Sequence, residues 1–186
     1  MSELSLHALP LKGLWQLQHA RHCDERGGFA RLFCQASLAS AGVAMSIRQI
    51  NHSVTRQRGA VRGLHYQVPP QAEYKLITCL RGEVWDVAVD VRADSPTFLH
   101  WHAERLCAGD GRSLLLAPGL AHGFQALSDD AELLYLHSAD YSPAHEGALS
   151  VHDPRLAIAW PLPIAQLSAR DQQHPFIDAS FAGVAL

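Results

Sequence analysis

The segment GEVWDVAVDVRADSPT, residues 82–97, alternates between two sets of side chains, and this alternation is the strongest constraint on the fold. A period of two is that of a β-strand, because successive side chains of a strand point to opposite faces of a sheet. Turn-forming residues flank the alternation, at Arg81-Gly82 and at residues 93–96. The segment therefore predicts a strand with two faces, Val84, Asp86, Ala88 and Asp90 on one and Trp85, Val87, Val89 and Val91 on the other.

Short apolar runs between turn residues recur along the chain and predict an all-β fold. One short helix is expected near residues 35–41, and the segment from Pro143 onward, rich in proline and short polar pieces, is expected to be irregular. About eight to ten strands in a single domain, residues 1–186, predict a sandwich or barrel, and a cupin-type jelly-roll barrel with short peripheral helices is the natural candidate. Further strands are expected at 46–54, 74–80, 97–106, 113–117, 123–126 and 132–138.

Charge and composition restrict the possible partners. The net charge is −3 with no run of like charges, so neither nucleic acid nor a membrane surface is an expected partner. The chain lacks an apolar stretch of about 18 residues, and its N-terminus lacks the pattern of a secretory signal. The four cysteines are scattered without a CxxC spacing, so we expect reduced thiols in a cytoplasmic protein: Cys23, Cys34, Cys79 and Cys107.

Four polar side chains stand in segments that otherwise predict strands: His65 in VRGLHYQ, Lys75 in EYKLITCL, Asp86 in the alternating segment and Tyr135 in ELLYLHS. An ionised group on an inward strand face is unfavourable unless it is paired. Each residue also has a structural interpretation. His65 and Tyr135 can be ordinary core residues, Lys75 can lie at a sheet edge, and Asp86 can lie on a solvent-exposed face. The strand pattern alone leaves both interpretations open.

Together, these four residues can form one acid–base site. His65 paired with Asp86 is a base whose tautomer is fixed and whose imidazolium form is stabilised. Lys75 can stabilise an oxyanion or enolate in a water-poor cavity. Tyr135 can return a proton from another direction. This set suits abstraction of a proton next to a carbonyl group, followed by reprotonation.

A metal site is the competing interpretation of LHWHAE, residues 99–104. His100, His102 and Glu104 would share one face of a strand, as metal ligands can. The segment follows an SPTF turn and leads into ERL, which is more typical of a solvent-facing strand. VRGLHYQ also carries a glutamine where a second histidine would be needed. We therefore expect no functional metal.

Several motifs, in order from about Arg26 to Asp171, resemble the dTDP-4-dehydrorhamnose 3,5-epimerase family. Any one of them is weak, but the ordered set is specific: DERGGF, INHS, VRGLHYQ, YKLI, GEVWDVAVDVRADSPTF, APGLAHGF, the strand with Tyr135, HEGAL, HDPRLAIAWP and LSARD. The resemblance implies a cupin-type jelly roll that works as a homodimer without a metal or other cofactor. It also implies a substrate, a nucleoside-diphosphate 4-keto-6-deoxyhexose epimerised at C3 and C5 through an enolate.

The resemblance also implies residue roles. His65 would be the general base supported by Asp86, Tyr135 the acid on the other face of the sugar, and Lys75 the residue that holds the enolate oxygen. Arg26 would lie in an N-terminal segment that contributes to the partner subunit's site. Arginine side chains suit the diphosphate, which they can bind bidentately. The implied substrate-binding positions are Arg26, Gln49, Asn51, Arg62, Lys75, His122, Glu146 and Arg170.

Three positions depart from the family's pattern. Arg31 stands where the family usually has a glutamate that faces the nucleotide, Arg170 replaces a lysine, and Val151-His152 replaces a tryptophan-containing lead into Asp-Pro. The acid–base residues are unchanged, so epimerase chemistry is expected, with the nucleotide and sugar left open. Two alternatives remain. One is an epimerase that inverts a single centre or uses another nucleotide, and the other is a non-catalytic cupin that binds sugar nucleotides.

Overall fold

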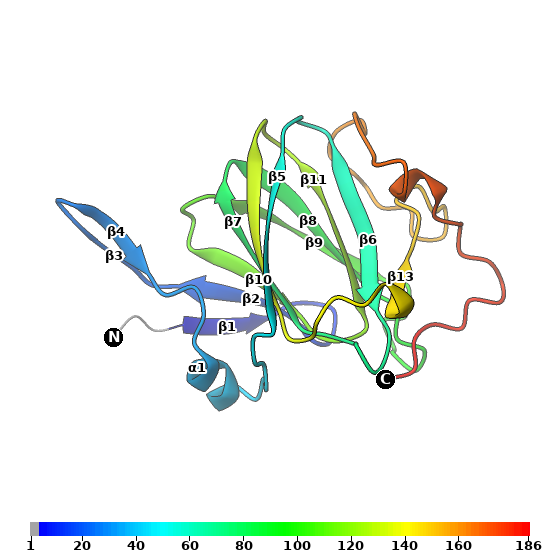
Figure 1. The fold of residues 1–186 in the computed structure, drawn as a ribbon, viewed down its shortest axis with the longest axis horizontal. Coiled ribbons are helices and arrows are strands. Elements are labelled where there is room, and N and C mark those ends of the chain that lie inside the picture. The colour runs from blue at the N-terminus through cyan, green and yellow to red at the C-terminus, as the bar shows by residue number, and fades with distance from the viewer. Residues whose placement is uncertain (1–3) are drawn as a thin grey trace.

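Two antiparallel sheets lie face to face in the computed structural model, which describes residues 4–186 (Figure 1). The six-stranded sheet has the order β1 (Leu4–Ala8), β2 (Leu14–His19), β10 (Arg112–Leu116), β7 (Lys75–Arg81), β12 (Ala131–His137) and β5 (Gln49–Thr55). The five-stranded sheet has the order β13 (Glu146–Ala148), β6 (Val61–Gln67), β11 (Leu120–Ala126), β8 (Glu83–Asp90) and β9 (Trp101–Cys107).

The alternation in β8 buries both faces of that strand. Val84 and Ala88 belong to the core between the two sheets, whereas Val87 and Val89 belong to a second core on the outer face of the five-stranded sheet. Asp86 points the same way as Val84 and Ala88 and is 0% exposed. The solvent-exposed interpretation of this face is therefore wrong, and Asp86 is a buried carboxyl group that requires a hydrogen-bonding partner.

The C-terminal segment forms the cover of that second core. Leu149, Val151, Leu156, Ile177 and Val184 pack against the outer face of the five-stranded sheet. The segment is irregular, as predicted, apart from β13 and two short 3₁₀ helices, η1 (Pro143–His145) and η2 (Asp171–Gln173). It is tied to the barrel by single parallel bridges, which pair residues 60 with 166 and 92 with 184. Figure 1 shows it running down one side of the molecule.

A third core lies on the outer face of the six-stranded sheet, where the short helix α1 (Gln35–Ser40) packs. Leu38 of the helix is fully buried against Leu76, Leu115 and Leu136 of three neighbouring strands. The prediction of a helix near residues 35–41 is confirmed. No helix within residues 4–186 is long and apolar enough to cross a membrane.

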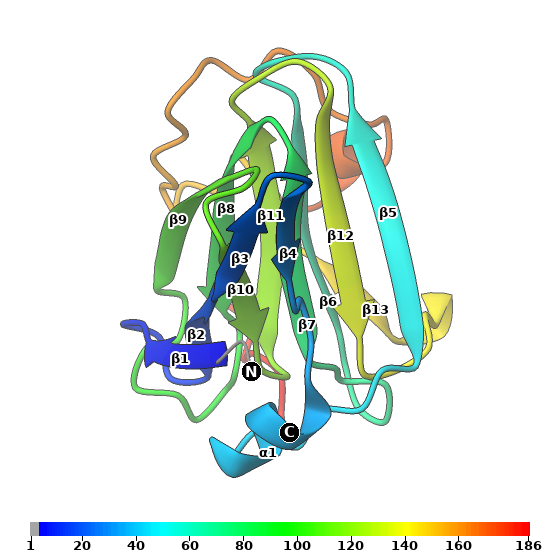
Figure 2. The same cartoon turned by 90° about the vertical axis from the view of Figure 1, so that its left-hand side faces the viewer.

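Residues 4–186 form thirteen strands where about eight to ten were predicted. The additional ones are β1, β2, the short β13, and a hairpin of β3 (Arg21–Asp24) and β4 (Gly27–Ala30). The hairpin sequences RHCD and GGFA carry no apolar alternation, and nearly all of their residues are exposed. Figure 1 shows the hairpin extending away from the barrel, and Figure 2, viewed from that side, shows it in front of the barrel. Backbone pairing alone forms it, so a hydrophobic pattern could not predict it.

The strand expected at 97–106 begins later, at Trp101. The reason is Asp90, which is fully buried at the end of β8 and binds side chains of the turn that follows it. Ser95 and Thr97 donate hydroxyl hydrogen bonds to its carboxylate, and the Arg92 guanidinium lies 2.7 Å from it. These bonds hold residues 92–99 in a compact turn, so the extended structure starts only after it.

Candidate active site

A pocket of about 400 Å³ opens between the two sheets, and its walls carry most of the predicted acid–base residues. Strands β5, β7 and β12 form one wall and β6 and β11 the other, while the segment before η2 closes the rim. The lining residues are Asn51, His52, Ser53, Arg62, His65, Lys75, His122, Phe124, Tyr135, His137, Ser168, Arg170 and Asp171. A larger hollow of about 560 Å³ lies elsewhere, beside the β3–β4 hairpin, and contains none of the predicted catalytic residues.

His65 faces the pocket because the residues before and after it in β6 point to the opposite face of the sheet. Leu64 and Tyr66 point into the outer core, which leaves His65 facing inward, half-buried. The strand approaches β11 very closely at this point. Gly63 has a φ of +132°, and a Cβ there would lie 2.5 Å from the Cα of Gly123, so only glycine fits. Two features of the VRGLHYQ motif thus position His65: the alternation of side chains along β6, and the close packing of the Gly63 backbone against β11.

Asp171 is the carboxylate that holds His65. Its Oδ1 lies 2.8 Å from His65 Nε2, and its side chain is almost completely buried. Burial opposes ionisation of this carboxyl, but hydrogen bonds from His65, Ser168 and the Gly63 backbone outweigh that effect and lower its pKa. An ionised acceptor requires a hydrogen on Nε2 of the imidazole. The Nδ1 lone pair of neutral His65 is therefore the one left to accept a proton.

The predicted pairing of His65 with Asp86 is wrong. Asp86 instead lies 2.9 and 3.0 Å from Nε2 of His122. The physical reason is the strand order, because β11 runs between β6, which carries His65, and β8, which carries Asp86. Asp86 is fully buried behind the pocket wall, so it contacts the pocket through His122.

Lys75 begins a chain of polar contacts across the β7–β12–β5 wall. Its Nζ lies 3.4 Å from Glu73 Oε1 and donates to the carbonyl oxygen of His65 at 3.2 Å. The other Glu73 oxygen is 3.0 Å from Nδ1 of His137, whose Nε2 is 3.4 Å from Asn51. Lys75 is 8% exposed and lines the pocket, so the sheet-edge interpretation of this lysine is wrong.

Tyr135 approaches from the wall opposite His65. It lies on β12 of the six-stranded sheet, and its hydroxyl is 3.1 Å from Ser53 Oγ on the adjacent strand β5. The His122 ring stands edge-on to it, with ring centroids 6.0 Å apart. Burial raises the pKa of the Tyr135 phenol well above its ordinary value. The group is therefore a proton donor at neutral pH.

Seven of the eight predicted substrate-binding residues lie in the pocket or beside it. Asn51, Arg62, Lys75, His122 and Arg170 line the pocket. Gln49 and Glu146 stand just behind its rim, since Gln49 donates to Asn51 Oδ1 at 3.0 Å and Glu146 pairs with Arg170.

Arg26 is the predicted residue that lies away from the pocket. It sits at the turn of the β3–β4 hairpin, where its guanidinium is 90% exposed and pairs with Asp24. The hairpin leads away from the barrel, so Arg26 does not approach the pocket of its own chain (Figure 1).

Sequence reasoning missed several residues of the pocket. Asp171 is the most important of these, and the others are His52, Ser53, Phe124, His137 and Ser168. Asp171 is part of the LSARD motif, in which only Arg170 was singled out. Ser53 and His137 share strand faces with Asn51 and Tyr135, so period-two alternation was the available signal for them. Nothing in the sequence pattern indicates that the segment before η2 returns to the barrel.

Among residues 4–186, His100, His102 and Glu104 do not come together as the metal site that was the competing interpretation of this segment. His102 lies 2.8 Å from Glu104, and both are half-buried on the inner side of the edge strand β9, so the expectation of a solvent-facing strand is also wrong for these two residues. His100 precedes the strand and is exposed. The turn organised by Asp90 ends just before it and breaks the alternation that would have aligned the three residues.

Comparisons with known proteins match this architecture over nearly the whole chain. The fold and the acid–base pocket between its sheets define a cupin-type jelly-roll epimerase, which is an isomerase of carbohydrates. A model of the family described as dTDP-4-dehydrorhamnose 3,5-epimerase matches residues 8–179. The chain belongs to this family, as its motifs predicted.

Individual relatives show the breadth of the match. A dTDP-4-dehydrorhamnose 3,5-epimerase from Mycobacterium tuberculosis is 39% identical over 181 residues, covering 95% of this chain and 89% of that protein. The dTDP-6-deoxy-D-glucose-3,5-epimerase of Legionella pneumophila, solved with dTDP-4-keto-L-rhamnose, has a TM-score of 0.90 at 35% identity, covering 98% of both chains. ChmJ, a 3'-monoepimerase from Streptomyces bikiniensis solved with dTDP-quinovose, has a TM-score of 0.85 at 39% identity, covering 91% of this chain and 86% of that one.

Proposed function

We propose that the protein epimerises a nucleoside-diphosphate 4-keto-6-deoxyhexose, of the dTDP-4-dehydro-6-deoxyglucose type, at C3 and C5 without a cofactor. The observation that carries the proposal is the placement of His65 and Tyr135 on opposite walls of one pocket. A ketone at C4 acidifies the hydrogens on both flanking carbons. A base on one face of the sugar and an acid on the other can therefore invert a centre through an enolate.

The polar contacts support a separate role for each of these side chains. Nδ1 of His65 takes the proton from carbon, and Asp171 stabilises the imidazolium that forms. The Lys75 ammonium group, held beside the pocket by Glu73, stabilises the enolate oxygen. Tyr135 then delivers a proton to the opposite face. Each step is a proton transfer or an electrostatic stabilisation by side chains of the pocket.

The arginines of the pocket supply the charge for a diphosphate. Arg62 is anchored to β5 through Thr55 Oγ1 at 3.0 Å and the Val54 carbonyl at 3.1 Å. Arg170 is held at the rim by Glu146, which also accepts a hydrogen bond from Tyr141 at 2.8 Å. Anchored guanidinium groups bind phosphate oxygens with little loss of side-chain entropy. We propose that these two residues hold the diphosphate while the sugar extends toward His65.

Two alternative functions can be tested against this proposal: epimerisation at a single carbon, and binding of a sugar nucleotide without catalysis. ChmJ acts on one centre, and a relative from Streptomyces niveus that is 41% identical is a dTDP-4-dehydrorhamnose 3-epimerase. Proton NMR with dTDP-4-keto-6-deoxyglucose in deuterated water separates these activities. Deuterium at both C3 and C5 supports the double epimerase, and deuterium at one carbon supports the single-centre enzyme. Binding without exchange would support the non-catalytic cupin and overturn the proposal.

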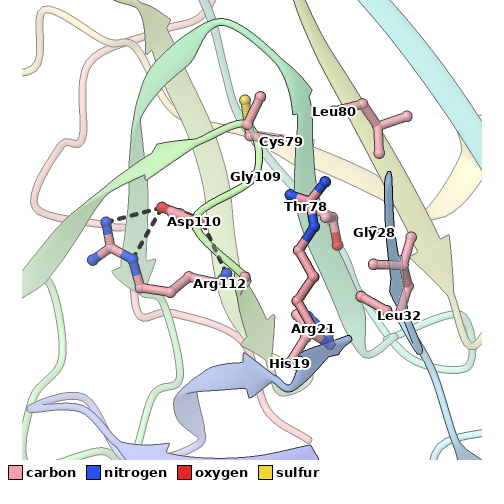
Figure 3. A pocket seen from close by; sticks show the side chains of 13 residues that line it. His19, Arg21, Gly28, Leu32, Thr78, Cys79, Leu80, Gly109, Asp110 and Arg112 are labelled. Atoms are coloured by element: carbon pink, nitrogen blue, oxygen red, sulfur yellow. Dashed lines mark hydrogen bonds and ion pairs between the residues drawn. The ribbon is translucent and has the colours of Figure 1, made fainter. Parts of the chain in front are cut away.

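We further propose that the chain forms one domain and acts as a homodimer in the cytoplasm. Exposed apolar side chains gather on the outer face of the six-stranded sheet and on the hairpin, namely Ile50, Val54, Leu80 and Phe29. Between that face and the hairpin lies the larger hollow, lined by Arg21, Gly28 and Leu80 among others (Figure 3). A second copy that covers this surface would contact the hairpin, which could then bring Arg26 to the partner's pocket. The four free thiols suit a reducing compartment.

Mixing two inactive variants tests the shared site. A hybrid dimer of Arg26→Ala and His65→Ala subunits contains one pocket with both residues intact, so activity should return after mixing. A mixture of His65→Ala with Tyr135→Phe is the matched control, because both residues belong to the same pocket and every hybrid site stays defective. Absence of rescue in the first mixture, with hybrid dimers demonstrated by mass, would contradict the role of Arg26.

A further inference from the structure

His174 is a buried histidine beside the dyad of His65 and Asp171 to which the proposed mechanism gives no role. Its side chain is 14% exposed, and its Nε2 has no hydrogen-bond partner within residues 4–186. That nitrogen lies 3.4 Å from Oδ1 of Asp171, the same oxygen that accepts from His65. A buried polar atom without a partner is unfavourable, so its orientation toward a carboxylate indicates an unused ligand position.

The local backbone produces this arrangement. The sequence RDQQH forms the 3₁₀ helix η2, with His174 as the residue that follows it. Side chains three residues apart in a 3₁₀ helix lie directly above one another. Asp171 and His174 therefore point in the same direction, toward β6, and the two histidine rings meet edge to face with centroids 5.8 Å apart.

We propose that His65, Asp171 and His174 form a binding site for a transition-metal ion of the Zn²⁺ or Co²⁺ type, and that its occupation inhibits the enzyme. One ligand atom from each residue lies within 4.8 Å of the other two. Metal–ligand bonds of about 2.0–2.1 Å in a tetrahedral site place neighbouring ligand atoms roughly 3.4 Å apart. The His174–Asp171 separation of 3.4 Å already has this value, and the 2.8 Å of the His65–Asp171 bond needs only a small opening.

The donor set determines the class of ion. Two imidazole nitrogens and one carboxylate oxygen suit Zn²⁺, Co²⁺ or Ni²⁺, whereas Mg²⁺ and Ca²⁺ prefer oxygen ligands throughout. The Asp171 carboxylate is already held in place by hydrogen bonds from Ser168 and the Gly63 backbone. His65 and Asp171 line the pocket, so an ion held there keeps an open coordination position facing the pocket.

Inhibition follows from the tautomer of His65. A metal bound at Nε2 replaces the hydrogen that Asp171 accepts, and a neutral imidazole then carries its hydrogen on Nδ1. That is the nitrogen that must be empty to take a proton from the substrate. The site thus goes beyond the proposed epimerase function, and it can exist whether or not the protein has that activity.

Cobalt binding tests the site without substrate. Titration of the protein with Co²⁺ should give visible absorption bands of a low-coordinate site that saturate at one ion per chain, and Zn²⁺ should remove them. His174→Ala should weaken Co²⁺ binding by more than the roughly 10- to 100-fold that follows loss of an outer-shell partner, because it removes a direct ligand. His102→Ala is the matched control, since it removes a half-buried histidine that pairs with a carboxylate elsewhere.

Inhibition by Zn²⁺ provides the second measurement. Epimerase activity of the unmodified protein should fall with added Zn²⁺ and return with a chelator, while His174→Ala should need a much higher Zn²⁺ concentration for the same loss. A lack of Co²⁺ binding by the unmodified protein would overturn the proposal. So would Co²⁺ affinity that His174→Ala leaves unchanged, or that His102→Ala reduces equally. If the unmodified protein binds Co²⁺ but shows no epimerase activity, the proposed function is contradicted, whereas the metal site is still supported by the Co²⁺ binding.

Discussion

Oδ1 of Asp171 lies 2.8 Å from Nε2 of His65, although 106 positions separate the two residues in the chain. One residue belongs to a central strand of the barrel and the other to a 3₁₀ helix in the C-terminal segment. The base of the pocket is therefore assembled by a contact between the barrel and its cover.

Replacement of His65 by alanine should abolish hydrogen exchange at both C3 and C5, because the same base serves both carbons. Loss of a general base costs roughly 100- to 10,000-fold in rate. Nucleotide binding, measured by calorimetry with dTDP, should remain largely intact. Replacement of the exposed His152 is the control and should change neither quantity. Near-normal turnover by His65→Ala would disprove the base assignment.

Asp171→Asn should lower the rate of exchange by roughly 100- to 10,000-fold, because an amide neither fixes the Nε2–H tautomer of His65 nor stabilises its imidazolium form. Asp86→Asn should leave this dyad intact and act through His122, which Asp86 contacts at 2.9 Å. Its exchange rate at saturating substrate should therefore fall much less. The opposite ranking of the two variants would support the pairing of His65 with Asp86 that the sequence indicated.

Tyr135→Phe should separate exchange from inversion. His65 can still remove a proton and return deuterium to the same face of the sugar, whereas the opposite face has lost its acid. NMR in deuterated water should therefore show label entering a substrate that keeps its original configuration. Ser53→Ala removes the 3.1 Å contact to the phenol and should reduce inversion only modestly. Inversion at the normal rate by Tyr135→Phe would exclude Tyr135 as the acid.

The alkaline limit of activity should reflect the burial of Tyr135. Burial raises the pKa of this phenol above its ordinary value of about 10, so the proton-donating form persists as the pH rises. The inversion rate should consequently show no loss from tyrosine ionisation below about pH 10. Stopped assays between pH 7 and 10, corrected for substrate stability, measure this. An inversion rate that falls with a midpoint near pH 8, while exchange continues, would contradict it.

Asp90→Asn should destabilise the fold by about 3 kcal/mol at pH 7, because it leaves the Arg92 guanidinium without its buried carboxylate. Burial opposes ionisation of Asp90, but the bonds from Arg92, Ser95 and Thr97 prevail and lower its pKa below 3.8. A lowered pKa gives stability that is complete above pH 3.8 and is lost as the pH falls through the folded-state value. The difference between the two proteins, measured by urea unfolding, should therefore shrink in acid. Asn at the exposed position Asp94 is the control.

Much of the barrel could be predicted from the sequence because its strands are buried in a regular pattern. Eight of the predicted strands match β5 to β12 within a few residues, since each carries apolar side chains at period two or as a short run. The β3–β4 hairpin lacks that pattern, and β13 has only three residues, so local propensity carried no signal for either. The active site shows the same contrast, because its strand residues could be predicted whereas its contacts between distant segments could not.

His65, Lys75 and Tyr135 could be predicted because each interrupts an apolar strand. The partner of His65 could not, because pairing depends on which strands are neighbours. Period-two reasoning placed Asp86 on the inward face correctly, but it could not reveal that β11 lies between that residue and His65. Asp171 lies in irregular structure, where no periodicity indicates which way a side chain points.

The position of η2 after the last strand has a consequence for biosynthesis. The thirteen strands of residues 4–186, which end with Ala148, leave the ribosome before Asp171 does. A nascent chain whose strands have all emerged therefore still lacks the carboxylate that fixes the tautomer of His65. The contact between His65 and Asp171 can form only when the C-terminal segment has emerged and packed against the barrel. In the finished protein, a protease cut between Ala148 and Asp171 would break the covalent link between the strands that carry His65 and the segment that carries Asp171.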